Sequence, residues 1–199
     1  MPTVLDVGCG QPDIIFPAHY AGWKRVRLDI DSTFRPDIVL DARQLHTLPA
    51  AQFDSVYCSH NLEHYHRHEG KKVLAGMRHV VRPEGFVEVR VPDLGAVLTK
   101  MVRDNMDIDD VLYTAGPGPI LVRDVIYGYH GEIEKTGQEF FAHRTGFTAK
   151  SLRQFFMGMG FLQIVVGTPF EYELVAFGFC QNPKPKQLQM LNLPEHLAG

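Results

Sequence analysis

A glycine-rich segment near the start of the chain has the composition of a ligand-binding loop. Residues 4–10 read V-L-D-V-G-C-G, an apolar run that ends in two glycines, with Asp6 two residues before the first of them. Glycine carries no side chain, so a ligand can approach the backbone closely there. The dinucleotide fingerprint needs a third glycine, but Asp13 holds that position and prolines lie on both sides of it. The segment therefore disfavours a nicotinamide-dependent dehydrogenase.

A second group of reactive side chains follows an apolar run at residues 53–58. His60, Glu63 and His64 spell H-x-x-E-H, the signature of inverted zinc peptidases, in which a helix presents two imidazoles to zinc and the carboxylate acts as a base. Here the motif directly follows a predicted strand, which disfavours zinc hydrolysis, and we keep it as an alternative. His66 and His68 continue an alternating pattern that is typical of a solvated loop, and we expect no metal site.

Short apolar runs bounded by polar residues, glycine or proline predict seven strands. They span residues 3–7, 25–31, 37–40, 53–58, 85–91, 162–166 and 173–180. Apolar residues at helical spacing predict a helix at about 69–81, and Thr148 as N-cap predicts another that ends near Gly160. The last two strands leave no room for a crossover helix, so they should form an antiparallel hairpin. The pattern is typical of an α/β fold with a mostly parallel seven-stranded sheet.

The chain has 199 residues, a length that suits one domain. We expect a single domain at 1–182 and a C-terminal extension at 183–199, which contains three prolines and no strong periodicity. The stretch at about 95–145 does not fit a simple crossover between strands. We interpret it as an insertion that covers the site.

Charge and cysteine content exclude several classes of protein. A formal net charge of −3 and a pI near 6.3 provide no overall attraction to nucleic acid or to anionic lipid. The sequence shows neither an apolar run of the roughly 18 residues that span a bilayer nor a secretory leader. We therefore expect a cytoplasmic protein with no membrane insertion and no nucleic-acid partner. Cys9, Cys58 and Cys180 have no C-x-x-C spacing and should be reduced, structural thiols.

Five segments in register resemble class I S-adenosylmethionine (SAM) methyltransferases. They are D-V-G-C-G at 6–10, L-D-I at 28–30, L-D-A at 40–42, the strand and loop at 53–64, and R-P-E-G-F at 82–86. The resemblance covers residues 3–94 well and implies a Rossmann-like methyltransferase fold. Gly22 and Trp23, just before the second strand, also make the chain similar to small methyltransferases associated with glycan or surface polysaccharide genes.

The resemblance implies SAM as the cofactor and assigns a part of it to each motif. The first motif, Asp6, Gly8, Cys9 and Gly10, would hold the methionine end. Asp29 would accept hydrogen bonds from both ribose hydroxyls, with Ile30 beside it. Asp41 would accept from the adenine amine, while a backbone amide at Ala42 or Arg43 meets a ring nitrogen. Ser59 and Asn61 would lie near the sulfonium. As an alternative, Asp29 and Asp41 simply cap turns, and Asp31 is the substitute if the register of the second strand differs.

Methyl transfer from a sulfonium requires alignment of the acceptor and, for a hydroxyl, a group that takes its proton. A neutral histidine titrates in a suitable range, which makes His60 and His64 the candidate catalytic residues. Tyr129, His130 and His143 are expected to line the acceptor site. The acceptor is expected to be a small molecule or glycan, with a sugar-linked or other hydroxyl as a candidate. A catalytically inactive cofactor-binding module is the other alternative, and the oligomeric state is left open.

Overall fold

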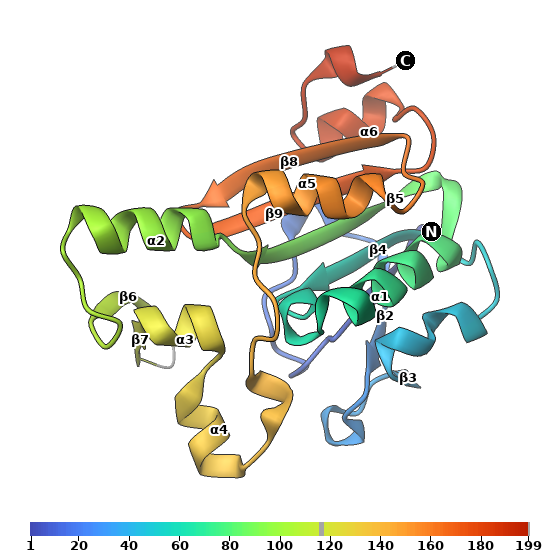
Figure 1. Ribbon diagram of the computed structural model, residues 1–199. Helices are drawn as coiled ribbons and strands as arrows, with labels where there is room; N and C mark the ends of the chain where they lie inside the picture. Colours follow the sequence, from blue (N-terminus) through green and yellow to red (C-terminus); the bar gives the residue numbers. More distant parts are fainter. Residues whose placement is uncertain (116–117, 199) are drawn as a thin grey trace.

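A seven-stranded sheet forms the centre of the protein (Figure 1). The computed structural model describes residues 1–115 and 118–198, so Gly116 and Pro117 of the expected insertion and Gly199 of the expected extension lie outside the described residues. The strands of the sheet are β1 (Thr3–Val7), β2 (Lys24–Asp29), β3 (Ile38–Val39), β4 (Phe53–Ser59), β5 (Val81–Pro92), β8 (Gln163–Phe170) and β9 (Glu173–Phe179). Their order across the sheet is β3-β2-β1-β4-β5-β9-β8.

The pairing confirms the predicted fold class. β1 pairs in parallel with β2 and β4, and the parallel pairs β2–β3 and β4–β5 extend this half of the sheet. β9 runs antiparallel to both β5 and β8, which forms the predicted C-terminal hairpin. The antiparallel strand β9 lies between β5 and β8, so β8 forms this edge of the sheet.

Helices α1 (Arg67–Val80) and α5 (Ala149–Met157), with the 3₁₀ helix η3 (Ala42–Thr47), cover one face of the sheet. The apolar positions of α1 recur at helical spacing and are fully buried, as are Leu152 and Phe156 of α5. Thr148 is the predicted N-cap of α5 and accepts from Ser151 N at 3.3 Å. Gly76 lets α1 pack closely against η3, since a Cβ at this position would lie 2.6 Å from Cβ of Leu45.

The opposite face is covered by less regular structure. Two prolines follow the glycine loop, and proline removes a helical hydrogen bond, so the connection to β2 contains only the 3₁₀ helix η1 (Ala18–Tyr20). Its buried Tyr20 packs with Tyr57 and Phe86 of the sheet. Residues after β9 form α6 (Pro185–Met190) and the 3₁₀ helix η6 (Glu195–Leu197). Leu191, which ends α6, belongs to the same apolar cluster.

The segment between β5 and α5 forms a lobe beyond the carboxyl end of β5 (Figure 1). Its elements are α2 (Leu94–Arg103), the hairpin β6 (Val111–Ala115) and β7 (Gly118–Leu121), α3 (Val122–Tyr127), α4 (His130–Thr136) and the 3₁₀ helix η5 (Glu139–Phe141). A separate apolar cluster around Val97, Leu112, Val122 and Val125 holds it together. No helix in the described part of the chain is long and apolar enough to cross a bilayer.

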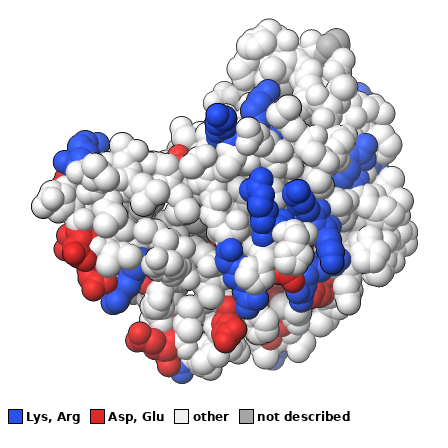
Figure 2. All heavy atoms as spheres, in the orientation of Figure 1, with Lys and Arg blue, Asp and Glu red and all other residues white. Residues whose placement is uncertain are grey.

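Charge is distributed unevenly over the surface. On the face shown in Figure 2, Lys and Arg side chains gather over α1 and α5, and Asp and Glu side chains lie mainly over the lobe after β5. The exposed basic residues of the two helices are Arg67, Lys71, Lys72, Lys150 and Arg153. The small net charge therefore conceals a local basic surface.

We expect α6 to contribute to the stability of the whole domain. Leu188 of α6 is fully buried, and truncating a buried leucine costs about 2–5 kcal/mol. Leu188→Ala should therefore lower the free energy of unfolding, measured by urea denaturation, by that amount. Its exposed neighbour Gln189 provides the control, since Gln189→Ala should change it by less than about 0.5 kcal/mol. Equal stability of the two variants would contradict this role.

Candidate functional site

A cavity of about 740 Å³ opens at the carboxyl ends of β1, β2 and β4. This is the edge of an open α/β sheet at which ligands bind, and the volume suits a molecule of cofactor size. The lining contains most of the residues expected from the sequence: Asp6, Gly8, Cys9, Gly10, Asp29, Ile30, Asp31, Ser59, His60, Asn61, His64 and Tyr129.

The glycine loop after β1 has a conformation that suits glycine. Gly8 and Gly10 have φ of 70° and 53°, a left-handed region that other residues rarely adopt. A Cβ at Gly8 would also overlap the side-chain amide of Asn61, which follows β4. The Gly8 and Cys9 amides both donate to the carbonyl of Leu28 in β2, at 2.9 and 3.1 Å. The loop is thus held against the ends of both neighbouring strands.

Asp29 connects this loop to the end of β2. Its carboxylate is 8% exposed and accepts from Gly10 N at 2.9 Å and from Asp31 N at 3.0 Å. Each carboxylate oxygen can accept a further hydrogen bond, so these two bonds fix the group and leave acceptor capacity at the cavity wall. Asp31 uses its own side chain to cap the 3₁₀ helix η2 (Ser32–Phe34), which favours Asp29 over Asp31 as the polar group for a ligand.

Asp6 is buried and paired with Arg25, a residue that the sequence analysis did not single out. Arg25 Nε and Nη2 donate to Asp6 Oδ2 at 2.8 and 2.6 Å, and its guanidinium lies 4.5 Å from the centre of the Phe16 ring. Burial raises the pKa of Asp6 and outweighs the lowering effect of Arg25. Arg25 alternates with Arg27 and Asp29 along β2, and this period-2 charge pattern was the signal that it faces the site.

The structure does not bring Asp41, Ala42 and Arg43 to the cavity. The 3₁₀ helix η3 begins at Ala42, and Asp41 caps it by accepting from Arg43 N at 2.9 Å. The Arg43 guanidinium then bridges Asp41 and Glu69, so both charged groups are engaged with one another. The turn-capping alternative describes Asp41 as it lies here, and its expected contact with the adenine amine stays a prediction.

His60 lies between two carboxylates at the rim of the cavity. Its Nε2 is 3.0 Å from Glu173 Oε1, and its Nδ1 is 3.5 Å from Glu63 Oε1. Partial desolvation lowers the pKa of His60, but Glu173 and Glu63 outweigh it and raise the pKa to about 10. The ring is therefore an imidazolium at neutral pH, which donates hydrogen bonds and does not accept a proton. Its surroundings do not support the expected role as a neutral base.

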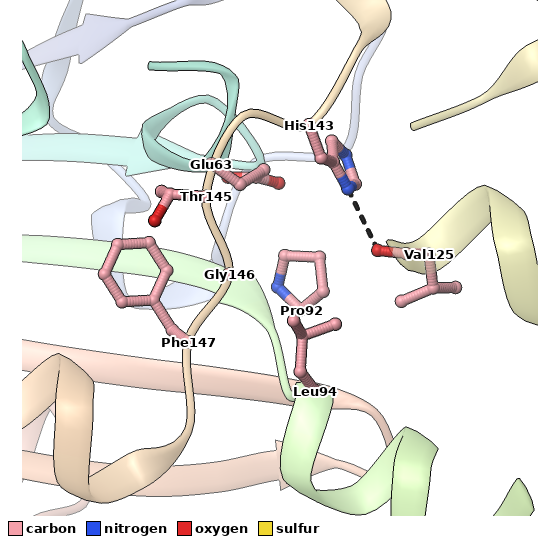
Figure 3. Close-up of a pocket in the computed structure, with 8 residues that line it drawn as sticks. All are labelled: Glu63, Pro92, Leu94, Val125, His143, Thr145, Gly146 and Phe147. Carbon is pink, nitrogen blue, oxygen red and sulfur yellow. Dashed lines mark hydrogen bonds between the residues drawn. The ribbon is translucent and has the colours of Figure 1, made fainter. Parts of the chain in front are cut away.

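Glu63 and His143 lie side by side beneath the rim (Figure 3). Glu63 is 1% exposed, and this burial alone would raise the pKa of its carboxyl group. The neighbouring His60, His64 and His143 have the larger, opposite effect, so the pKa of Glu63 is lowered. His143 Nδ1 donates to the Val125 carbonyl at 2.9 Å, which leaves Nε2 as an acceptor. Burial lowers the pKa of His143, so its ring is neutral at pH 7. Both nitrogens of His64 instead face carbonyl oxygens, of Ala142 and His60.

The H-x-x-E-H motif does not have the geometry of a zinc peptidase. His60 has φ of 47° and precedes the short 3₁₀ helix η4 (Leu62–His64), so no helix presents His60 and His64 on one face. Among the described residues, the potential metal-ligand atoms that lie within 4.8 Å of one another belong instead to Glu63, His64 and His143. The peptidase alternative is therefore wrong for this structure, because it depends on a helical pair of imidazoles.

A smaller cavity of about 160 Å³ adjoins the large one and shares His60 and Tyr129 with it. Of the residues expected to contact an acceptor, Tyr129 and His143 line it. His130 lines neither cavity, and its Nδ1 lies 2.8 Å from the Gly128 carbonyl.

Sequence reasoning also missed the apolar part of the large cavity. Ile14 and Ile15 of the loop after β1 and Phe140 of η5 line it, although they are 53%, 92% and 61% exposed. Large apolar side chains left exposed beside a cavity are typical of a ligand-binding surface. Their sequence positions, in two loops more than 120 residues apart, carried no periodic signal.

The chain has the Rossmann-like fold of methyltransferases. Residues 5–89 match a family model described as a methyltransferase domain. This segment of the chain is therefore similar to a methyltransferase domain. The matched segment includes the glycine loop, Asp29 and the loop after β4.

Solved structures share the fold at low sequence identity. The PH0226 protein from Pyrococcus horikoshii is 18% identical, with a TM-score of 0.61, over 92% of this chain and 82% of that one. A SAM-dependent methyltransferase from Archaeoglobus fulgidus is 13% identical, with a TM-score of 0.56, over 89% and 85%. The 1,6-didemethyltoxoflavin-N1-methyltransferase from Burkholderia thailandensis, solved with bound 1,6-didemethyltoxoflavin and S-adenosylhomocysteine (SAH), is 17% identical, with a TM-score of 0.56, over 89% and 70%. No curated protein sequence matches the chain significantly.

The His60 ion pairs predict a specific pH dependence of stability. The pKa of His60 is about 10 in the folded protein and about 6.5 when unfolded, so its stabilising effect is complete below about pH 6.5 and lost as pH rises through 10. The stability difference between the wild type and His60→Gln should therefore shrink between pH 6.5 and 10.5, as measured by urea denaturation. Because the side chain is 51% exposed, we expect a small amplitude.

His68→Gln is the matched control, since His68 is exposed on α1 and has no ion-pair partner among the described residues. Its difference from the wild type should stay constant over the same range. A constant difference for His60→Gln as well would show that the two ion pairs do not form in solution.

Proposed function

We propose that the 740 Å³ cavity binds SAM and that the protein transfers the methyl group to a hydroxyl of a small-molecule acceptor, reached from the side of His60 and Tyr129. The observation that supports this most directly is the position of the glycine loop and Asp29. They lie together at the carboxyl edge of the parallel strands, on the wall of one cavity of suitable volume.

Each part of the cofactor has a chemically suitable partner in the cavity. Asp29 retains acceptor capacity for the ribose diol, and Ile30 offers an apolar surface next to it. The backbone at Gly8 to Gly10, with Asp6 and Arg25 behind it, suits the zwitterionic methionine end. Ser59 ends β4, Asn61 follows it, and both line the cavity beside the glycine loop, where the sulfonium would be. The adenine would contact Ile30 and Phe34 in place of the expected Asp41.

The lobe at about 95–145 is proposed to cover the acceptor site. It supplies Tyr129, Glu132 and Phe140 to the large cavity, from elements that the matched methyltransferase segment does not contain. The acceptor specificity would then depend on this lobe, since the cofactor residues lie in the sheet. The comparisons give no support to the narrower expectation of an association with glycan genes.

Cofactor binding is tested by calorimetric titration with SAM and SAH. Asp29→Asn removes a charged acceptor, and loss of such a bond costs about 1.5–3 kcal/mol, so the affinity should fall about 10- to 150-fold. Asp109→Asn is the control, because Asp109 is 61% exposed in the lobe and should leave the affinity unchanged. Failure of the wild type to bind either ligand at millimolar concentration would refute the proposal.

The alternative of an inactive cofactor-binding module predicts binding without turnover. An assay can distinguish the inactive module from an active methyltransferase. The protein is incubated with SAM and fractions of a cell extract, and the SAH formed above the rate without protein is measured. Accumulation of SAH in proportion to added enzyme supports methyl transfer. Tight SAM binding with no SAH formed in any fraction supports the inactive module.

A further inference from the structure

The smaller cavity lies beside the proposed cofactor site, on the side of β5 and β9. Its walls come from four places: the end of β5 at Pro92, the β8–β9 turn at Tyr172, the loop after β4 at His60, and the lobe. Because it shares His60 and Tyr129 with the large cavity, a group held in it would face the contents of the large one. This position is suitable for the part of an acceptor that receives the methyl group.

The walls of this cavity are mostly aromatic and aliphatic. Tyr113 and Tyr172 stack with ring centres 5.7 Å apart and planes within 12°, and Tyr129, Ile120 and Val125 complete the apolar surface. Asp124 is the buried acid in the wall, but its oxygens already accept from Leu121 N at 2.9 Å and His130 N at 3.3 Å. A cavity of about 150 Å³ holds a benzene ring in another protein, so about 160 Å³ is sufficient for one aromatic ring.

His143 is a neutral side chain in the wall of this apolar space. His143 donates its Nδ1 proton to the Val125 carbonyl, and this bond fixes the ring and leaves the lone pair on Nε2. His60 also lines this cavity, is shared with the large cavity and is positively charged. A proton acceptor and a fixed positive charge are the two groups that would stabilise a developing phenolate.

We propose that the smaller cavity binds the ring of a phenol, that the phenol oxygen is the methyl acceptor, and that His143 Nε2 takes its proton. The O–H bond breaks as the proton moves to Nε2, and the oxygen forms a bond to the methyl carbon of SAM. The C–S bond breaks with its electron pair on sulfur, so the products are a methyl ether, SAH and an imidazolium, which later releases its proton to water. This assignment rests on the proposed function and adds the substrate class and the base.

A sugar ring fits these walls less well than a phenol. Each additional hydroxyl of a sugar would need a partner, and an unmet buried polar group costs free energy. Asp124 is already engaged, and the Tyr172 hydroxyl donates to Glu171 at 2.7 Å. A phenol presents one hydroxyl, which His143 can meet, and an apolar face that suits the tyrosines.

The binding part is tested on SAH-loaded protein by ligand-observed NMR titration with phenol and catechol, and with methyl β-D-glucopyranoside as the sugar probe. We expect the phenols to bind and the glucoside not to bind. Tyr172→Ala should weaken phenol binding about 3- to 10-fold, and Ile120→Trp, which fills the cavity from β7, should abolish it. Tyr127→Ala is the matched control, because Tyr127 is 54% exposed and lies outside this cavity, and it should have no effect.

The chemical part is tested by SAH formation from SAM with a panel of substituted phenols. His143→Gln should lower the rate about 100-fold or more at saturating SAM, without changing the affinity for SAM measured by calorimetry. A retained rate would overturn the assignment of the base. Binding of the glucoside alone, phenol binding insensitive to Ile120→Trp, or no turnover of any phenol would overturn the substrate class. In each of these cases normal SAM binding, together with SAH formation in the cell-extract fractions, would show that the proposed function still holds.

Discussion

The site depends on the hydrogen bonds that hold the loop after β1 against the end of β2. Gly8 and Cys9 donate to the Leu28 carbonyl, Gly10 donates to Asp29, and Arg27 Nη2 donates to the Gly10 carbonyl at 2.6 Å. These bonds form because the two strands are parallel neighbours, which places their carboxyl ends at one edge. They leave the glycine backbone open toward the cavity. A side chain at Gly8 would displace Asn61 and disturb the opposite wall as well.

A chain of alternating charges extends from the sheet to the rim of the cavity. Glu88 on β5 is fully buried and is surrounded by the His19 ring, the Tyr20 hydroxyl and Arg90, all within 3.0 Å. Arg90 also contacts Glu173 on β9, and Glu173 pairs with His60. Removing a single member of a buried charged network leaves its partner uncompensated. The position and charge of His60 therefore depend on the pairing of β5 with β9, far from it in sequence.

Much of the fold was predictable because its signals are local. Buried parallel strands appear as short apolar runs, α1 has apolar positions at helical spacing, and Thr148 marks the start of α5. Several residues that line the large cavity were also predictable, since Asp6, Gly8, Gly10 and Asp29 occupy positions fixed by strand ends. The role of Asp41 was not predictable in this way, because the same carboxylate can cap a turn or contact a ligand, and both uses look identical in sequence.

The sequence by itself determined the α/β class, the order of the strands along the chain and the residues at the ends of β1, β2 and β4, because backbone propensity and burial act over a few residues. Only the tertiary structure decided the charge of His60 and the neutrality of His143. Glu173, which raises the pKa of His60, lies 113 residues from it, and the pKa of His143 is lowered by burial in the folded protein. A pKa depends on neighbours in space, and a sequence names the titratable group without naming those neighbours.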